Sequence, residues 1–184
     1  MEFEKLKIDG LVLCKPKIIK DERGFFSEIF RKDLLENFIS EKLDFCQHNT
    51  SKSSFGVLRG LHFQTAPKAQ TKLISVSHGE VLDVVLDIRK DSPSYGKHCS
   101  VILNDINNFQ LLVPRGFAHG FISMSKVAKV NYQVDNYYNS EYEFGINPFD
   151  DDLKINWILK KNQIIINNKD KSNINLSESP VYKF

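Results

Sequence analysis

Short apolar runs separated by closely spaced turn signals fill the middle of this chain, and they constrain its fold more than any other feature. Residues 72–90 contain two strand-like runs around a His-Gly-Glu turn. In the second run, apolar residues at the even positions from 82 to 88 alternate with the residues at the odd positions from 81 to 87. This is the period of a β-strand. Further runs follow at 99–104 and 109–114, and residues 121–138 predict another hairpin. The pattern predicts a mainly β fold, a single antiparallel barrel or sandwich over residues 1–184.

One helix is expected in residues 31–43. Leu34, Leu35, Phe38 and Ile39 recur at helical spacing, and Asp33 can serve as the N-cap. No run of about 18 apolar residues exists, so no membrane span is expected. The N-terminus mixes acids and lysines and lacks the apolar region of a signal peptide.

Composition narrows the function classes. The net charge is +2 with acids and bases interleaved, and the lysine-rich patches near 160 and 170 are short and interrupted. Nucleic-acid binding is therefore not expected, whereas a small anionic ligand fits. The cysteines Cys14, Cys46 and Cys99 are far apart and odd in number. They predict reduced thiols in a cytoplasmic protein rather than disulfides or a zinc motif.

The stretch GVLRGLHFQ, residues 56–64, is unusually polar for a core strand. By alternation His62 and Gln64 share one face, which would point into a barrel that can enclose one small ligand. Strict alternation puts Arg59 on the other face, unless Gly60 marks a bulge that turns Arg59 toward the same pocket. A half-buried structural histidine, with its hydrogen bonds made within the protein, explains His62 as well as a catalytic histidine does. GLHFQ contains no second histidine, so a metal site is not expected.

Two further stretches carry candidate chemistry. In LLVPRGFAHGF, residues 111–121, a Pro-x-Gly-x-x-His turn leads into a strand and aims His119 toward the barrel; the pattern resembles the second signature of the cupin barrels. In DERGFFSEIFR, residues 21–31, a turn at Arg23-Gly24 precedes a strand whose Phe26, Glu28 and Phe30 share one face. That face is either a half-exposed edge or a surface for a planar, anionic ligand such as a nucleotide.

Together and in this order, five blocks of the chain resemble the dTDP-4-dehydrorhamnose 3,5-epimerase family. The blocks are DERGFFSEIF, QHNTSKSSFGVLRGLHFQTAPKAQTKL, GEVLDVVLDIRKDSPSYG, QLLVPRGFAHGF and YQVDNYY. The resemblance extends from about Ile8 to Asp170. It implies a cupin-type antiparallel β-barrel (jelly roll) with a few short helices, which works without metal or organic cofactor and usually as a homodimer.

The resemblance also implies a reaction, namely epimerisation of a nucleotide-diphosphate 4-keto-6-deoxyhexose at carbons 3 and 5 in dTDP-rhamnose synthesis. This chemistry needs a base, an acid on the opposite side and a group that holds the enolate oxygen. By resemblance the base is His62, oriented by Asp170. The acid is Tyr132, and Lys72 lies beside the keto oxygen.

The same resemblance assigns the rest of the substrate site. His119 matches a histidine of the sugar pocket, with Asp83 as a possible partner. Part of the nucleotide site comes from the neighbouring subunit's N-terminal strand in this family. The residues that match the nucleotide and diphosphate end are Arg23, Phe26, Glu28, Gln47, Asn49, Arg59, Glu143 and Lys169.

Three positions depart from the family pattern. Pro148 replaces a tryptophan, Ile158 replaces a proline, and Thr71 replaces a glycine just before Lys72. They leave open which nucleotide base and which keto sugar the chain uses, so a 3- or 3,5-epimerase of another sugar, such as a GDP-linked keto-heptose, is the nearest alternative. A non-catalytic sugar-binding cupin and a metal-dependent cupin oxygenase are the alternatives from other classes.

Overall fold

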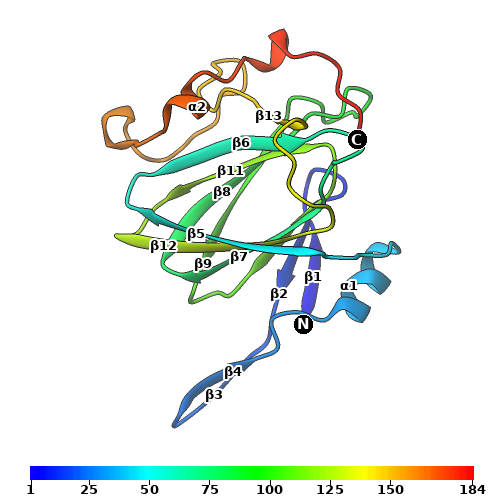
Figure 1. Ribbon diagram of the computed structural model, residues 1–184. Coiled ribbons are helices and arrows are strands. Elements are labelled where there is room, and N and C mark those ends of the chain that lie inside the picture. The colour runs from blue at the N-terminus through cyan, green and yellow to red at the C-terminus, as the bar shows by residue number, and fades with distance from the viewer.

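Two antiparallel sheets face each other in the structure of this chain, a computed structural model that describes residues 1–184 (Figure 1). The strands of the six-stranded sheet are β1 (Glu2–Lys5), β2 (Val12–Lys15), β5 (Gln47–Ser54), β7 (Lys72–His78), β10 (Gln110–Val113) and β12 (Val127–Val134). The strands of the five-stranded sheet are β6 (Leu58–Gln64), β8 (Glu80–Asp87), β9 (His98–Asn104), β11 (Phe117–Ser123) and β13 (Glu143–Gly145). The spatial orders are β1-β2-β10-β7-β12-β5 and β13-β6-β11-β8-β9.

From β5 onward the chain passes from one sheet to the other at almost every connection, with the β8–β9 pair as the exception. The fold is therefore mainly β and of the cupin-like jelly-roll type, as predicted. The hairpin predicted for residues 121–138 is wrong, because its two runs belong to different sheets. Strand β11 lies between β6 and β8, whereas β12 lies between β7 and β5.

Strand alternation separates the core into layers. Val81 and Val85 of β8 point between the sheets into one apolar cluster, whereas Leu82, Val84 and Leu86 point outward into a second. The predicted alternation in residues 81–88 is thus confirmed, and β8 is buried on both faces. A third cluster lies on the outer face of the six-stranded sheet, where helix α1 (Lys32–Ile39) covers it.

Helix α1 begins two residues earlier than it would with Asp33 as its N-cap. The N-cap is Arg31, whose backbone is extended, and Asp33 lies in the first turn. The carboxylate of Asp33 accepts a hydrogen bond of 2.6 Å from the Arg31 guanidinium. The predicted cap is therefore wrong, although an acid in the first turn still suits the helix dipole.

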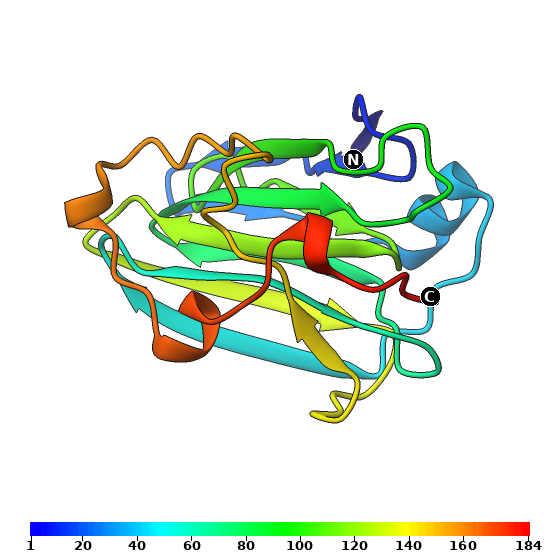
Figure 2. The ribbon, with the colours of Figure 1, turned by 90° about the horizontal axis from the view of Figure 1, so that it is seen from above.

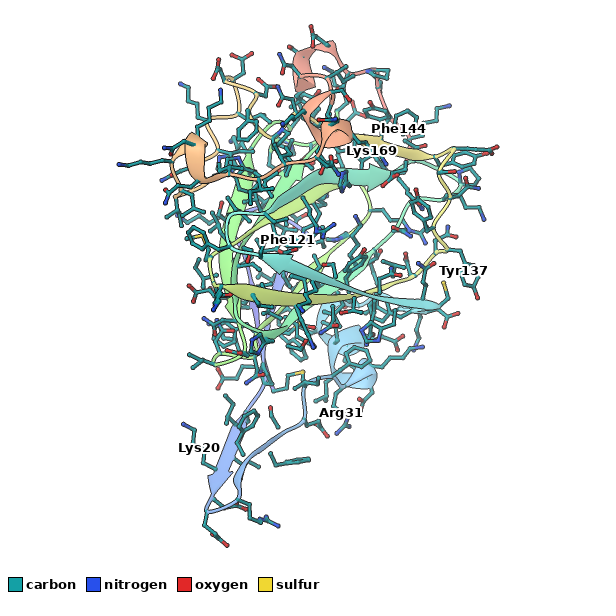
Figure 3. The ribbon with its side chains drawn as sticks, turned by 60° about the vertical axis from the view of Figure 1, so that its left-hand side comes forward. Lys20, Arg31, Phe121, Tyr137, Phe144 and Lys169 are labelled. Atoms are coloured by element: carbon teal, nitrogen blue, oxygen red, sulfur yellow. The ribbon has the colours of Figure 1, made fainter.

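A two-stranded hairpin of β3 (Ile18–Asp21) and β4 (Gly24–Ser27) projects away from both sheets, with Lys20 far from them in Figure 3. The strand predicted through residue 30 ends at Ser27, so Glu28 lies beyond it. Apolar side chains are exposed on this arm, and Phe26 retains 69% of its accessible surface.

The chain after β13 crosses the outer face of the five-stranded sheet, which is clear from above in Figure 2. It contains short helical turns at Lys161–Gln163 and Leu176–Glu178 and helix α2 (Asn168–Lys171). The side chains of Leu153, Trp157 and Leu176 pack into the second apolar cluster. This packing fixes α2 against the strand that contains His62. No helix has the length and apolar character needed to span a membrane.

Candidate active site

A cavity of about 380 Å³ opens between the edge strands of the two sheets and is mostly polar. Its lining residues are Gln47, Asn49, Ser51, Arg59, His62, Phe63, Gln64, Gln70, Lys72, His119, Phe121, Tyr132, Tyr138, Glu143, Asn167 and Asp170. Phe121, labelled in Figure 3, lies between the two sheets. The structure therefore brings together residues from both sheets and from helix α2.

His62 and Asp170 form a pair at this cavity. Nε2 of His62 lies 2.7 Å from Oδ1 of Asp170, and the other carboxylate oxygen accepts a hydrogen bond of 3.1 Å from the Gly60 amide. Asn167 caps α2 by accepting from the Asp170 amide, which fixes the start of the helix. Burial raises the pKa of Asp170, but the hydrogen bond from His62 and the neighbouring charges outweigh it, so the pKa lies below its usual value. The carboxylate stays ionised and keeps a proton on Nε2.

Lys72 occupies the first position of β7, and only 8% of it is exposed. Its ammonium donates a hydrogen bond of 3.2 Å to the carbonyl oxygen of His62. Burial lowers the pKa of Lys72 to about 8, while Glu143 and Asp83 partly oppose this shift. A buried cation beside the histidine is suited to stabilise negative charge that develops on a ligand.

Tyr132 approaches the cavity from the opposite sheet. It lies on β12, directly across from Asn49 of β5. Burial raises the pKa of Tyr132, Arg59 lowers it and Glu143 raises it, and the net shift is upward. The phenol therefore remains protonated and available as a proton donor at neutral pH.

His119 and Asp83 form a second, more deeply buried pair. Nε2 of His119 lies 2.8 Å from Oδ2 of Asp83, and the other oxygen of Asp83 is buried without a hydrogen-bond partner. His119 is also the direct cross-strand neighbour of His62. The pairing of Asp83 with His119, suggested by the sequence, is confirmed.

The strand that contains His62 is bulged at its glycine, as the sequence hypothesis required. His119 of β11 pairs with His62, and Phe121 pairs with Arg59, so β6 has an extra residue between the paired positions. Gly60 has φ +128°, and a Cβ added there would lie 2.5 Å from Cα of Gly120. The bulge turns Arg59 to the same side as His62, where it lines the cavity mouth and donates a 3.1 Å hydrogen bond to Ser53.

Glu143 connects one rim of the cavity to α2. Its carboxylate accepts hydrogen bonds from the Tyr138 hydroxyl, at 2.9 Å, and from the ammonium of Lys169. Burial raises the pKa of Glu143, but these two bonds and the adjacent charges bring it below its usual value. Figure 3 shows Lys169 on α2, close to Phe144 of β13.

Gln47 and Asn49 line the other rim, on the edge strand β5. The side-chain amide of Gln47 donates to Asn49 over 2.8 Å, and its carbonyl oxygen accepts from the Tyr138 backbone amide over 3.0 Å. Tyr138 is a cavity residue that the sequence reasoning missed. The only local feature that could have indicated Tyr138 is the Tyr-Tyr pair that ends YQVDNYY, in the loop after β12.

Four predicted site residues do not line this cavity within one chain. One of them is Lys169, whose ammonium instead bonds Glu143 of the lining. Arg23, Phe26 and Glu28 lie on or just after the projecting arm, and the Arg23 guanidinium pairs with Asp21 instead. The three departures from the family pattern are also outside the cavity lining. Thr71 is bonded through its backbone to Asp135, and the Pro148 carbonyl accepts from Trp157 on the outer layer.

The lining also includes residues that sequence reasoning did not assign, among them Ser51, Phe121 and Asn167. Alternation on β5 was the available signal for Ser51, because positions 47, 49 and 51 share a face. No group of three or more His, Cys, Asp or Glu side chains is arranged to hold a metal ion.

Comparison with known proteins gives one consistent result. The family model described as dTDP-4-dehydrorhamnose 3,5-epimerase matches residues 5–178. The enzyme of that name from Methanothermobacter thermautotrophicus is 43% identical over 183 residues, covering 98% of this chain and 97% of its own. The Escherichia coli enzyme is 39% identical over 178 residues, covering 97% of this chain and 96% of its own.

A solved structure agrees in both fold and sequence. It is the dTDP-6-deoxy-D-glucose-3,5-epimerase of Legionella pneumophila in complex with dTDP-4-keto-L-rhamnose, with a TM-score of 0.94 and 40% identity. The match covers 100% of this chain and 98% of that one. With a matching family model, near full-length relatives and a shared fold, this chain belongs to the dTDP-4-dehydrorhamnose 3,5-epimerase family.

Proposed function

We propose that this chain is an isomerase that epimerises dTDP-4-dehydro-6-deoxy-D-glucose at carbons 3 and 5, a step of dTDP-rhamnose synthesis for surface polysaccharide. One observation carries the proposal. A histidine of the five-stranded sheet, paired with a carboxylate of helix α2, and a protonated phenol of the six-stranded sheet face one cavity. Epimerisation requires proton removal from one face of a carbon and proton return to the other.

In the proposed mechanism His62 is the base. Because Asp170 holds the proton on Nε2, the lone pair of the neutral imidazole lies on Nδ1 and accepts the proton from carbon. The carbon lies next to the ketone, so the electron pair of the broken C–H bond moves onto the ketone oxygen. The buried ammonium of Lys72 stabilises that enolate, an effect worth about 3 kcal/mol for comparable donors.

Tyr132 completes the inversion as the acid. Its hydroxyl gives a proton to the carbon from the opposite face as the ketone re-forms, and both side chains return to their starting states by exchange with solvent. The new C–H bond therefore contains a proton derived from water. His119, buried with Asp83, is assigned to the sugar pocket. All of these groups belong to the chain itself, and the proposal needs no metal or cofactor.

The nucleotide and diphosphate are assigned to the cavity mouth. Arg59 and Lys169 supply cations, and a guanidinium suits phosphate because it can bind two oxygens at once. Gln47, Asn49 and Glu143 offer further amide and carboxylate groups to the substrate. The remaining members of this set are Arg23, Phe26 and Glu28, and we assign them to the partner's site in a homodimer. The projecting, exposed arm supports this assignment.

The free thiols Cys14, Cys46 and Cys99 support a cytoplasmic location. We further propose that residues 1–184 form one epimerase domain.

Solvent-deuterium incorporation tests the function. Incubation in D₂O with dTDP-4-dehydro-6-deoxyglucose is expected to label both carbon 3 and carbon 5, as read by NMR. Label at carbon 3 alone, or label only with a GDP-linked keto sugar, would overturn the assignment. His62→Ala is expected to abolish exchange and leave dTDP affinity almost unchanged, with the exposed His78→Ala as its control. If His62→Ala exchanges like the parent, His62 is not the base. A parent chain that incorporates no deuterium into any of these keto sugars would be a binding protein.

A further inference from the structure

The hydroxyl of Ser51 is buried and has no hydrogen-bond partner, although the residue lines the main cavity. A buried hydroxyl without a partner is costly, because it has lost the hydrogen bonds that water would supply. Such a group in a binding cavity is satisfied when a ligand supplies the missing partner. The neighbouring strand does not supply it, since the residue directly across from Ser51 is the fully buried, apolar Val130.

The register of β5 places Ser51 between two groups with assigned roles. Asn49, the preceding residue on the same face, pairs directly with Tyr132 on β12. Ser53, the following residue on that face, accepts the hydrogen bond from the Arg59 guanidinium. Alternate residues of a strand are about 7 Å apart. Ser51 therefore lies one such step from Asn49, which neighbours the proposed acid, and one step from Ser53, which bonds the proposed diphosphate ligand.

A bound hexose has a defined order of groups along this path. This step rests on the proposed function, in which Arg59 binds the diphosphate attached to carbon 1 and Tyr132 acts at carbon 3. The atom between them is carbon 2, which in a 6-deoxyhexose has a hydroxyl. We propose that Ser51 is a specificity-determining residue that hydrogen bonds the 2-hydroxyl of the sugar.

The pairing makes the site selective against 2-deoxy sugars. A 2-deoxy substrate would fill the cavity while leaving the Ser51 hydroxyl buried and unsatisfied. Sites built to hydrogen bond a substrate hydroxyl discriminate strongly against analogues that lack it. For a single neutral hydrogen bond we expect a preference of about tenfold in kcat/KM.

The test compares two substrates with two enzymes. Deuterium incorporation at carbon 3 is measured for dTDP-4-dehydro-6-deoxyglucose and for its 2-deoxy analogue. The parent chain is expected to prefer the 2-hydroxy sugar, and Ser51→Ala should lose about tenfold in kcat/KM with that sugar only. Thr50→Ala is the matched control, because Thr50 lies on the outer face of the same strand. It should leave both substrates unchanged.

Two results would overturn the assignment while leaving the proposed function intact. One is an equal loss with both sugars in Ser51→Ala. The other is weaker binding of dTDP itself by Ser51→Ala, which would show that the hydroxyl contacts phosphate. A parent chain that labels neither sugar would reject the proposed function and the assignment of Ser51 with it.

Discussion

Nε2 of His62 lies 2.7 Å from Oδ1 of Asp170, although 108 residues separate the two in the chain. The carboxylate is 1% exposed, and its hydrogen-bond partners are the His62 imidazole and the Gly60 amide. An amide in its place no longer holds the proton on Nε2. We therefore expect Asp170→Asn to lower kcat by a hundredfold or more, with little change in dTDP affinity.

Measurement of kcat against pH separates this orienting role from a structural one. In Asp170→Asn the imidazole loses the carboxylate that orients it and stabilises its charged form, so the pH profile of kcat should differ from that of the parent. Asp151→Asn, an exposed carboxyl in a loop, is the control and should behave like the parent. An unchanged pH profile with a lower unfolding temperature would show that Asp170 only holds α2 in place.

The lowered pKa of Lys72 predicts an alkaline limit to activity. Its ammonium is charged below a pKa of about 8 and is lost as the pH rises through that value. Tyr132 does not ionise in this range, because its pKa is raised above its ordinary value. We expect kcat/KM, which reports free-enzyme groups, to fall above about pH 8 in the parent. The residual activity of Lys72→Met should not fall above pH 8. If it falls as in the parent, a group other than Lys72 causes the alkaline decrease in kcat/KM.

The same lysine is expected to lower the free energy of unfolding at neutral pH. A base whose pKa is lower in the folded state destabilises that state fully below the folded pKa, and the penalty disappears above the unfolded value. Lys72→Met is therefore expected to raise the free energy of unfolding by about 1 to 3 kcal/mol at pH 7. The gain should shrink between pH 8 and pH 10.5. Urea unfolding at several pH values measures it, and a variant less stable than the parent at pH 7 would contradict the argument.

Much of the fold could be predicted from local pattern, because the strands of the core alternate strictly. The failure at residues 121–138 has a physical cause. A short turn between two strands is compatible with lateral pairing and with a passage between sheets, and only long-range packing decides which occurs. The N-cap error at Asp33 is local, since Arg31 adopts the extended backbone of a cap without a side-chain cap bond.

Local sequence pattern predicted less of the candidate site than of the fold. Nothing near Asp170 indicates a partner for His62, and the pair was found only through the family resemblance. Arg59 is the opposite case, because Gly60 beside it signalled the bulge that the structure contains. A single chain does not bring Arg23 and Phe26 to the cavity, because the arm that contains them projects away from both sheets.

Gly60 should be indispensable for the bulge. Gly60→Ala adds a Cβ at φ +128° and only 2.5 Å from the Gly120 backbone. We expect a loss of about 2 to 4 kcal/mol in the free energy of unfolding. Gly24→Ala is a close control, because its φ is +126° and no atom lies within 4 Å of the added carbon. The control should lose only about 1 kcal/mol, and equal losses in urea unfolding would show that crowding at Gly120 is unimportant.

The projecting arm allows a mixing experiment that tests whether it completes a partner's site. One variant lacks the arm side chains, Arg23→Ala with Phe26→Ala, and the other lacks the base, His62→Ala. Each alone should be nearly inactive. If the arm reaches the partner's cavity, random reassortment makes half of the dimers mixed, and one of the two sites in each is intact. Activity should then recover to about a quarter of the parent value.

The control for this recovery is a mixture of His62→Ala and Asp170→Asn. Both residues line the cavity of the same chain, where they are 2.7 Å apart, so a mixed dimer still has two defective sites. No recovery is expected there. If the arm variant mixed with His62→Ala also fails to recover, although native mass spectrometry shows mixed dimers, the arm serves its own chain or none. In either case the exposed Phe26, at 69% accessibility, does not complete the site of a partner.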